Sequence, residues 1–274
     1  MRYRLFACDL DGTLLNDRGT ISKTNLEYIR RAKQCGVAVV ITTGRSYAKA
    51  KAYISEVDTG DPAVVFTGAV IYHNGQILRA ATLNGELIHD IIKLLKDMDY
   101  PPIIYPTDNN KYYESFGSYQ DDYLSFSQGF DGKLIKVDDI LKRRWEDVIR
   151  VSVIGGEHDM QLLHKEVKRR FGSSVTAVDT YFKKSGFSIF EVLDHSSSKS
   201  KALEFICRRF NIRQEEVVAC GDNNNDIDMI RWAGLGISMK NGLDDLVRAA
   251  DYVTIRDNNE DGVAEILEKF ILSR

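Results

Sequence analysis

The sequence predicts an α/β protein with a Rossmann-like three-layer core on a parallel sheet and an inserted α+β cap domain. Short apolar strands alternate with amphipathic helices in the first and last thirds of the chain. These strands are continuously apolar, as in a parallel sheet covered on both faces. The middle is richer in aromatic residues and breaks the alternation. We therefore expect a core from residues 1–82 and 189–274, interrupted by an insertion over 83–188.

The first third alternates strand and helix, with local signals at the boundaries. Ser22 is the expected N-cap of the first helix and Gly36 its end. Asn74-Gly75 predicts a hairpin turn. The expected elements are strands at 3–10, 37–42 and 63–67, helices at 22–36 and 46–57, and a hairpin over 70–78.

The last third repeats the alternation. We expect helices at 199–210, 225–233, 242–249 and 260–272, and strands at 216–220, 235–238 and 252–254. In the middle region, helices are expected at 85–98 and 158–171, with several short strands between them.

Composition and charge limit the classes of partner that we expect for this chain. The chain has 274 residues and a net charge of −3, so no global basic field favours nucleic acid or a membrane surface. No apolar run approaches the roughly 20 residues of a membrane helix. The four cysteines form no CxxC pair, as expected of reduced thiols. We expect a cytoplasmic monomer or small homo-oligomer without nucleic-acid or membrane partners.

Polar residues collect where core strands end. Ligands bind at the carboxyl ends of the strands in an open parallel sheet, so these residues are expected to converge on one edge. They are Asp9, Asp11, Gly12 and Thr13 after the first strand, Thr42, Thr43, Gly44 and Arg45 after the second, and Asp222, Asn225 and Asp226 after the strand at 216–220.

The pair Asp9 and Asp11 has more than one interpretation. A calcium loop is excluded, because position 14 would need glycine and position 20 glutamate, where the chain has Leu14 and Thr20. A solvated strand end remains possible for an isolated pair. On an extended strand, side chains two apart point the same way, so both carboxylates could flank one substrate atom. A cluster of oxygen ligands near phosphate suits Mg²⁺.

The segments "DLDGTLL", "ITTGR", a lysine opening a late helix and "CGDNNNDIDM" resemble, in order, the four motifs of the haloacid dehalogenase-like phosphatases. The place and α+β character of the insertion resemble the Cof-type sugar-phosphatase subfamily. The resemblance implies a magnesium-dependent phosphatase that hydrolyses sugar phosphates or related small phosphorylated metabolites.

Carried over by position, the resemblance implies that Asp9 attacks phosphorus and becomes an aspartyl phosphate. Asp11 protonates the leaving oxygen and then activates water. Magnesium is held by Asp9, the Asp11 backbone carbonyl and Asp222, with Asp226 coordinating or supporting it. The expected phosphate-binding residues are Leu10, Gly12, Thr43, Gly44, Arg45, Lys199 and Asn225.

Two alternatives stay open: a phosphomutase on the same scaffold, and a non-catalytic sensor of a phosphorylated ligand. Three departures from the family leave contacts by Thr67, Lys240 and Asn241 undecided, and Asn241 could equally be a helix cap. We expect Lys201 to be a surface residue. In the insertion, the candidates for contacts with the leaving group are Tyr105, Tyr112, Tyr113, Tyr181, Lys183 and Lys184.

Overall fold

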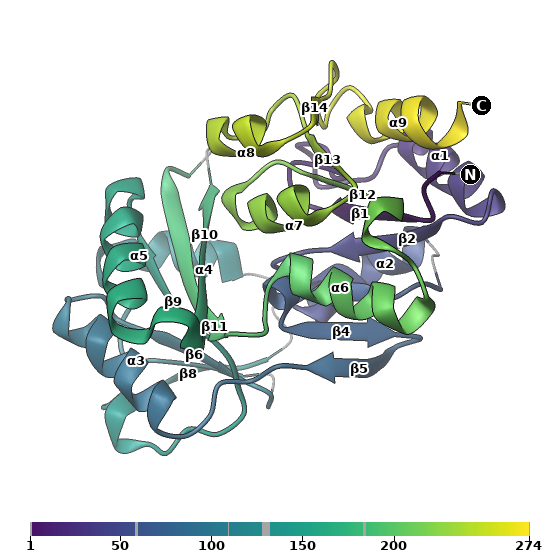
Figure 1. The fold of residues 1–274 in the computed structure, drawn as a ribbon. Helices are drawn as coiled ribbons and strands as arrows, with labels where there is room; N and C mark the ends of the chain where they lie inside the picture. Colours follow the sequence, from purple (N-terminus) through teal and green to yellow (C-terminus); the bar gives the residue numbers. More distant parts are fainter. Residues whose placement is uncertain (1, 58–59, 109, 128–131, 183–184, 274) are drawn as a thin grey trace. The chain divides into compact units, whose positions relative to one another are not determined.

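The computed structural model describes residues 2–57, 60–108, 110–127, 132–182 and 185–273. The chain forms two compact units, which are described separately (Figure 1). The first contains the residues up to Arg79 and those from Ser198 onward, and the second runs from Ala80 to Ser197. The expected α/β core with an inserted α+β domain is confirmed.

The first unit is built on an eight-stranded sheet of order β14-β13-β12-β1-β2-β3-β4-β5. Its strands from β14 to β3 pair in parallel, and β4 returns antiparallel to β3. Their bounds are β1 (Leu5–Asp9), β2 (Ala38–Thr42), β3 (Ala63–Val65), β4 (Val70–His73), β5 (Gln76–Ala80), β12 (Val217–Gly221), β13 (Leu235–Ser238) and β14 (Tyr252–Val253).

Helices cover both faces of this sheet. Leu5 and Ala7 of β1 pack in one buried cluster with residues of α6, α7 and α8. Strand side chains alternate between faces, so Phe6 and Cys8 point to the other layer, and both are fully buried. The helices are α1 (Lys23–Gln34), α2 (Tyr47–Val57), α6 (Lys199–Phe210), α7 (Ile227–Trp232), α8 (Asp244–Ala249) and α9 (Gly262–Ile266), which continues as a π-helical turn over Leu267–Leu272.

The local signals account for several boundaries. The Ser22 side chain accepts a hydrogen bond from Asn25 N and so caps α1. Asn74 and Gly75 both have positive φ, as the tight hairpin between β4 and β5 requires. The first strand is shorter than expected, because the chain turns after Asp9 and Gly12 takes φ +75°.

The second unit has a six-stranded sheet of order β10-β11-β9-β6-β7-β8. One buried cluster joins this sheet to α3 and α5. The elements are α3 (Glu86–Asp97), β6 (Ile103–Pro106), β7 (Lys111–Tyr113), α4 (Gln120–Ser127), β8 (Leu134–Lys136), β9 (Val148–Gly155), α5 (Glu157–Phe171), β10 (Val175–Phe182) and β11 (Phe187–Asp194).

The ends of the second unit differ from the expected insertion. Strand β11 pairs with β9 and β10 along its length, so it belongs to the second unit, although the sequence placed a boundary at 188. Tyr105 and Tyr112 are buried in this unit, whereas Lys183 and Lys184 lie outside the described residues. Within the described residues, every helix is too short or too polar to span a lipid bilayer.

Candidate active site

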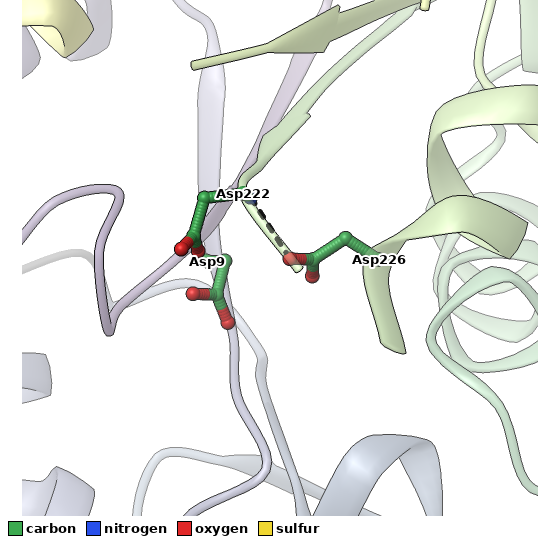
Figure 2. A group of neighbouring side chains, drawn as sticks. All are labelled: Asp9, Asp222 and Asp226. Carbon is green, nitrogen blue, oxygen red and sulfur yellow. Dashed lines mark hydrogen bonds between the residues drawn. The ribbon is translucent and has the colours of Figure 1, made fainter. Parts of the chain in front are cut away.

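Three carboxylates from two neighbouring strand ends form the centre of the site. Cys8 of β1 and Cys220 of β12 are register partners, so Asp9 and Asp222, which follow them, emerge at the same edge of the sheet. Asp226 comes from the turn after β12. Carboxylate oxygens of Asp9, Asp222 and Asp226 all lie within 4.8 Å of one another (Figure 2). The convergence expected from the motif positions is therefore found for these three residues.

Lys199 supplies the positive charge of this cluster. Its Nζ donates to Oδ1 of Asp9 at 2.6 Å, to Oδ1 of Asp226 at 2.5 Å and to the carbonyl of Thr42 at 3.3 Å. The side chain is fully buried at the first residue of α6, and Ser198 caps that helix. Lys201, two residues later, is exposed. The position of Lys199 in the first turn is explained by its two buried carboxylate partners.

The electrostatics of the cluster are dominated by burial. Burial raises the pKa of Asp9 to about 8, helped by Asp226 and Asp11 and opposed by Lys199. The pKa of Asp222 is raised well above its usual range, first by burial and then by Asp9 and Asp226. For Lys199, burial works to lower the pKa, but the carboxylates of Asp226 and Asp9 outweigh it and the pKa is raised. An additional cation beside Lys199 would favour the ionised forms of Asp9 and Asp222.

The hydrogen bonds assign different tasks to the three carboxylates. Both oxygens of Asp226 accept hydrogen bonds. Oδ1 accepts from Lys199, and Oδ2 accepts from the backbone N–H groups of Asn223 and Asp222. Figure 2 shows the bond to Asp222. Oδ1 of Asp222 accepts from Thr13 Oγ1 at 3.2 Å. No hydrogen bond between described residues reaches Oδ2 of Asp9 or Oδ2 of Asp222. These two oxygens are available to an incoming ligand.

Gly12 lets the loop after β1 pass close to Asp222. It has φ +75°, and a Cβ at this position would overlap Oδ2 of Asp222 and lie 2.7 Å from its Cγ. The Gly12 carbonyl accepts a hydrogen bond from Asn241 Nδ2 at 2.8 Å. A side chain at position 12 would displace Asp222.

Asp11 lies just beyond the end of β1. Strand β1 ends at Asp9, so the alternation of an extended strand does not extend to position 11. The Asp11 carboxylate is instead exposed and accepts from Arg45 Nε at 2.7 Å and from Arg45 Nη2 at 2.5 Å. That Asp9 and Asp11 flank one substrate atom stays a prediction.

The remaining expected phosphate-binding residues line the same edge. Thr43 is buried, and its Oγ1 accepts from Arg45 N at 3.1 Å. A Cβ on Gly44 would lie 3.6 Å from Asn225 Nδ2 and 3.4 Å from Thr67 Oγ1, so these two side chains flank the Thr43 loop. Leu10 is buried, and its carbonyl accepts from Leu15 N at 2.8 Å.

Several contacts that support the site could not be predicted from the sequence. No role is predicted for the Thr42 carbonyl, because backbone acceptors leave no sequence signal. Asn241 does not cap α8, whose N-cap is Leu243, but holds the Gly12 carbonyl and accepts from Asn258 N at 3.2 Å. Lys240 forms an exposed ion pair with Glu260.

Comparison with known proteins identifies relatives along nearly the whole chain. The sequence profile described as haloacid dehalogenase-like hydrolase matches residues 6–267. The chain is 30% identical over 268 residues to 5-amino-6-(5-phospho-D-ribitylamino)uracil phosphatase YitU of Bacillus subtilis, covering 97% of each chain. It is 25% identical to pyridoxal phosphate phosphatase YbhA of Escherichia coli, covering 99% of this chain and 100% of the other.

Solved structures give the same result for the fold. The structure of SMU.1108c from Streptococcus mutans superposes with a TM-score of 0.85 at 19% identity, covering 99% of this chain and 100% of the other. At this identity the likeness concerns the fold alone.

Proposed function

We propose, from the premise that this chain belongs to the haloacid dehalogenase-like hydrolases, that it cleaves its substrates with Mg²⁺ through an aspartyl-phosphate intermediate on Asp9. The chain is a phosphatase of phosphorylated small molecules, as its family and its named relatives establish. The observation that carries the proposal is the buried Asp9, which is bonded to Lys199 through one oxygen and keeps the other available.

The residues present fit a small divalent cation. Asp9 and Asp222 each keep one carboxylate oxygen without a hydrogen-bond donor among the described residues. Burial, helped by the neighbouring carboxylates, raises the pKa of both, and a bound cation would oppose this by favouring their ionised forms. Hard oxygen ligands of this kind suit Mg²⁺. We assign Asp9 and Asp222 as its side-chain ligands and Asp226 as the residue that holds Lys199 and the Asp222 backbone. When bound, Mg²⁺ would neutralise charge and orient the phosphoryl group.

In this mechanism the Asp9 carboxylate attacks phosphorus in line with the leaving oxygen, and the bond to that oxygen breaks. The Lys199 ammonium fixes the nucleophile and offsets charge on the phosphoryl oxygens. The Thr43 hydroxyl, at the end of the neighbouring strand, is assigned to a phosphoryl oxygen. Asp11 gives its proton to the leaving group and then takes one from the water that hydrolyses the acyl phosphate.

The substrate is proposed as a class. The names of YitU and YbhA give two different phosphorylated compounds, so the relationship of this chain to them does not select one substrate. We propose phosphate monoesters of small metabolites, with sugar phosphates among them.

The test is to trap the intermediate. Rapid acid quench of the protein with a ³²P-labelled aryl phosphate and Mg²⁺ should give label bound covalently at Asp9, and free phosphate should follow. Excess chelator should abolish both signals, and calcium should support turnover poorly. Turnover without covalent label, or full activity in chelator, would contradict the proposal.

Measuring phosphate release and product identity distinguishes the two alternatives. A phosphomutase given a hexose 1-phosphate would return the isomer rather than release phosphate. A non-catalytic sensor would bind phosphate and release none from any substrate.

A further inference from the structure

Asp11 and Arg45 form a two-pronged ion pair at the edge of the site. Arg45 Nε donates to one oxygen of Asp11 at 2.7 Å, and Arg45 Nη2 donates to the other at 2.5 Å. The Asp11 side chain is 52% exposed and that of Arg45 is 26% exposed. This matched geometry fixes the direction of the carboxylate more firmly than a single contact would.

The two partners are held unequally. The Arg45 guanidinium has a second contact besides Asp11, because it lies 5.0 Å from the centre of the Tyr53 ring. The Asp11 carboxylate has no donor other than Arg45 among the described residues. Arg45 is therefore the fixed partner, and Asp11 is the one that can move.

The pairing conflicts with the task proposed for Asp11. While both of its oxygens accept hydrogen bonds from Arg45, the carboxylate is directed at Arg45 rather than at a leaving-group oxygen. A phosphoryl group presents the same paired oxygens to a guanidinium and carries more charge than a carboxylate. Arg45 sits one residue beyond Gly44 in the loop that carries Thr43, where such a group would bind. A phosphoryl group that takes the Nε and Nη2 donors therefore displaces Asp11 from them.

We propose that Arg45 exchanges partners: it holds Asp11 in the resting protein and passes to the anionic ligand when a phosphate monoester binds, which releases Asp11. The inference rests on the proposed function and adds a step to it. The substrate must compete with an internal carboxylate for Arg45, and this competition couples its arrival to the release of Asp11. In the rival interpretation, the ion pair is a permanent brace between two loops.

A double-mutant cycle of phosphate binding distinguishes the two interpretations. The probe is inorganic phosphate, titrated by calorimetry in the presence of Mg²⁺ into the wild type, Asp11→Asn, Arg45→Gln and the double variant. Exchange predicts that Asp11→Asn tightens phosphate binding about tenfold, because the internal competitor is gone. In the Arg45→Gln background, the same change should alter affinity by less than about threefold.

Controls isolate the effect. Asp17→Asn removes an exposed carboxylate from the same loop and reports the general effect of charge; it should leave phosphate affinity within about twofold. Arg45→Lys keeps the positive charge but removes the paired N–H donors. It replaces Arg45→Gln in the cycle if that variant fails to fold. Thermal unfolding of each variant checks the fold.

The outcomes are distinct. Equal effects of Asp11→Asn with and without Arg45, or no tightening by Asp11→Asn in the protein that keeps Arg45, would overturn the exchange while leaving the phosphatase intact. Absence of phosphate binding and of phosphate release in the wild type would overturn the proposed function itself.

Discussion

Nζ of Lys199 lies 2.6 Å from Oδ1 of Asp9, although the two residues are 190 positions apart in the sequence, and neither side chain is more than 7% exposed. A buried ammonium with two carboxylate partners is costly to remove, because its loss leaves both carboxylates buried without a cation. The stability of the first unit and its chemistry therefore depend on the same contacts.

Replacing Lys199 by methionine should impair both properties. Asp9 and Asp226 would lose their buried cation, at a cost of about 3–5 kcal/mol in the free energy of unfolding without metal. Phosphate release should fall by at least about 100-fold, since the phosphoryl charge loses a partner. Urea unfolding and an aryl phosphate assay measure the two effects. Lys201→Met, in the same helical turn, is the control and should change neither; near wild-type activity in Lys199→Met would contradict the assignment.

Replacing Asp9 by asparagine should separate activity from stability. The amide keeps the size of the side chain but lacks the charge that attacks phosphorus, so turnover should fall to background. Unfolding without metal should need at least as much urea as for the wild type, because repulsion among the carboxylates is relieved. Substantial turnover by the folded variant would refute Asp9 as nucleophile.

Magnesium should stabilise the protein more at high pH than at low pH. The pKa of Asp9 is raised to about 8, so the folded state retains a proton that the unfolded state has already lost. The contribution of Asp9 to the free energy of unfolding therefore falls between about pH 4 and about pH 8 without metal. Magnesium binds the ionised form, so its effect should grow over the same window.

Thermal unfolding with and without millimolar MgCl₂ across this range measures the effect. In Asp9→Asn the growth with pH should be smaller. A magnesium effect independent of pH in the wild type would contradict the assignment of the ligands.

Adding a methyl group at Gly12 should damage the metal site. Gly12 has φ +75° and its Cβ would overlap Oδ2 of Asp222, so Gly12→Ala should displace that ligand and reduce both magnesium affinity and activity. Gly36→Ala is a matched control, because Gly36 has φ +82° and no atom within 4 Å of its Cβ position. It should cost about 1 kcal/mol of stability and no activity. Equal losses of activity in both variants would show that backbone strain alone is responsible.

Exchanging residues 80–197 for the corresponding segment of a relative should change substrate preference rather than the chemistry. All the residues assigned to attack, proton transfer and metal binding belong to the first unit. Activity toward a small aryl phosphate should stay within about tenfold, whereas the ranking of larger phosphate monoesters should change. Specificity constants for a panel of substrates measure this. An unchanged ranking in a folded chimera would locate the preference in the first unit.

The sequence predicts those parts of the fold and site that follow from strand order. Asp9 and Asp222 could be paired because each follows a buried parallel strand, and Ser22 and the Asn74-Gly75 turn carry local signals. The pairing of Asp11 with Arg45 could not be predicted, since the two residues are 34 positions apart and follow different strands. The predicted domain boundary at 188 differs from the observed one, because the sequence of an apolar strand such as β11 does not show to which of the two sheets it belongs.

The position of β1 in the sheet has a consequence for synthesis. Leu5 pairs with Ala38 of β2 on one side and with Val217 of β12 on the other, and the whole second unit is translated between these two partners. A growing chain that has reached residue 197 therefore carries β1 with one edge unpaired, a template for wrong pairing. Lys199, Asp222 and Asp226 are still to be made at that stage. The nascent protein should thus need protection from aggregation, and it should gain its phosphatase activity only as the last strands are added.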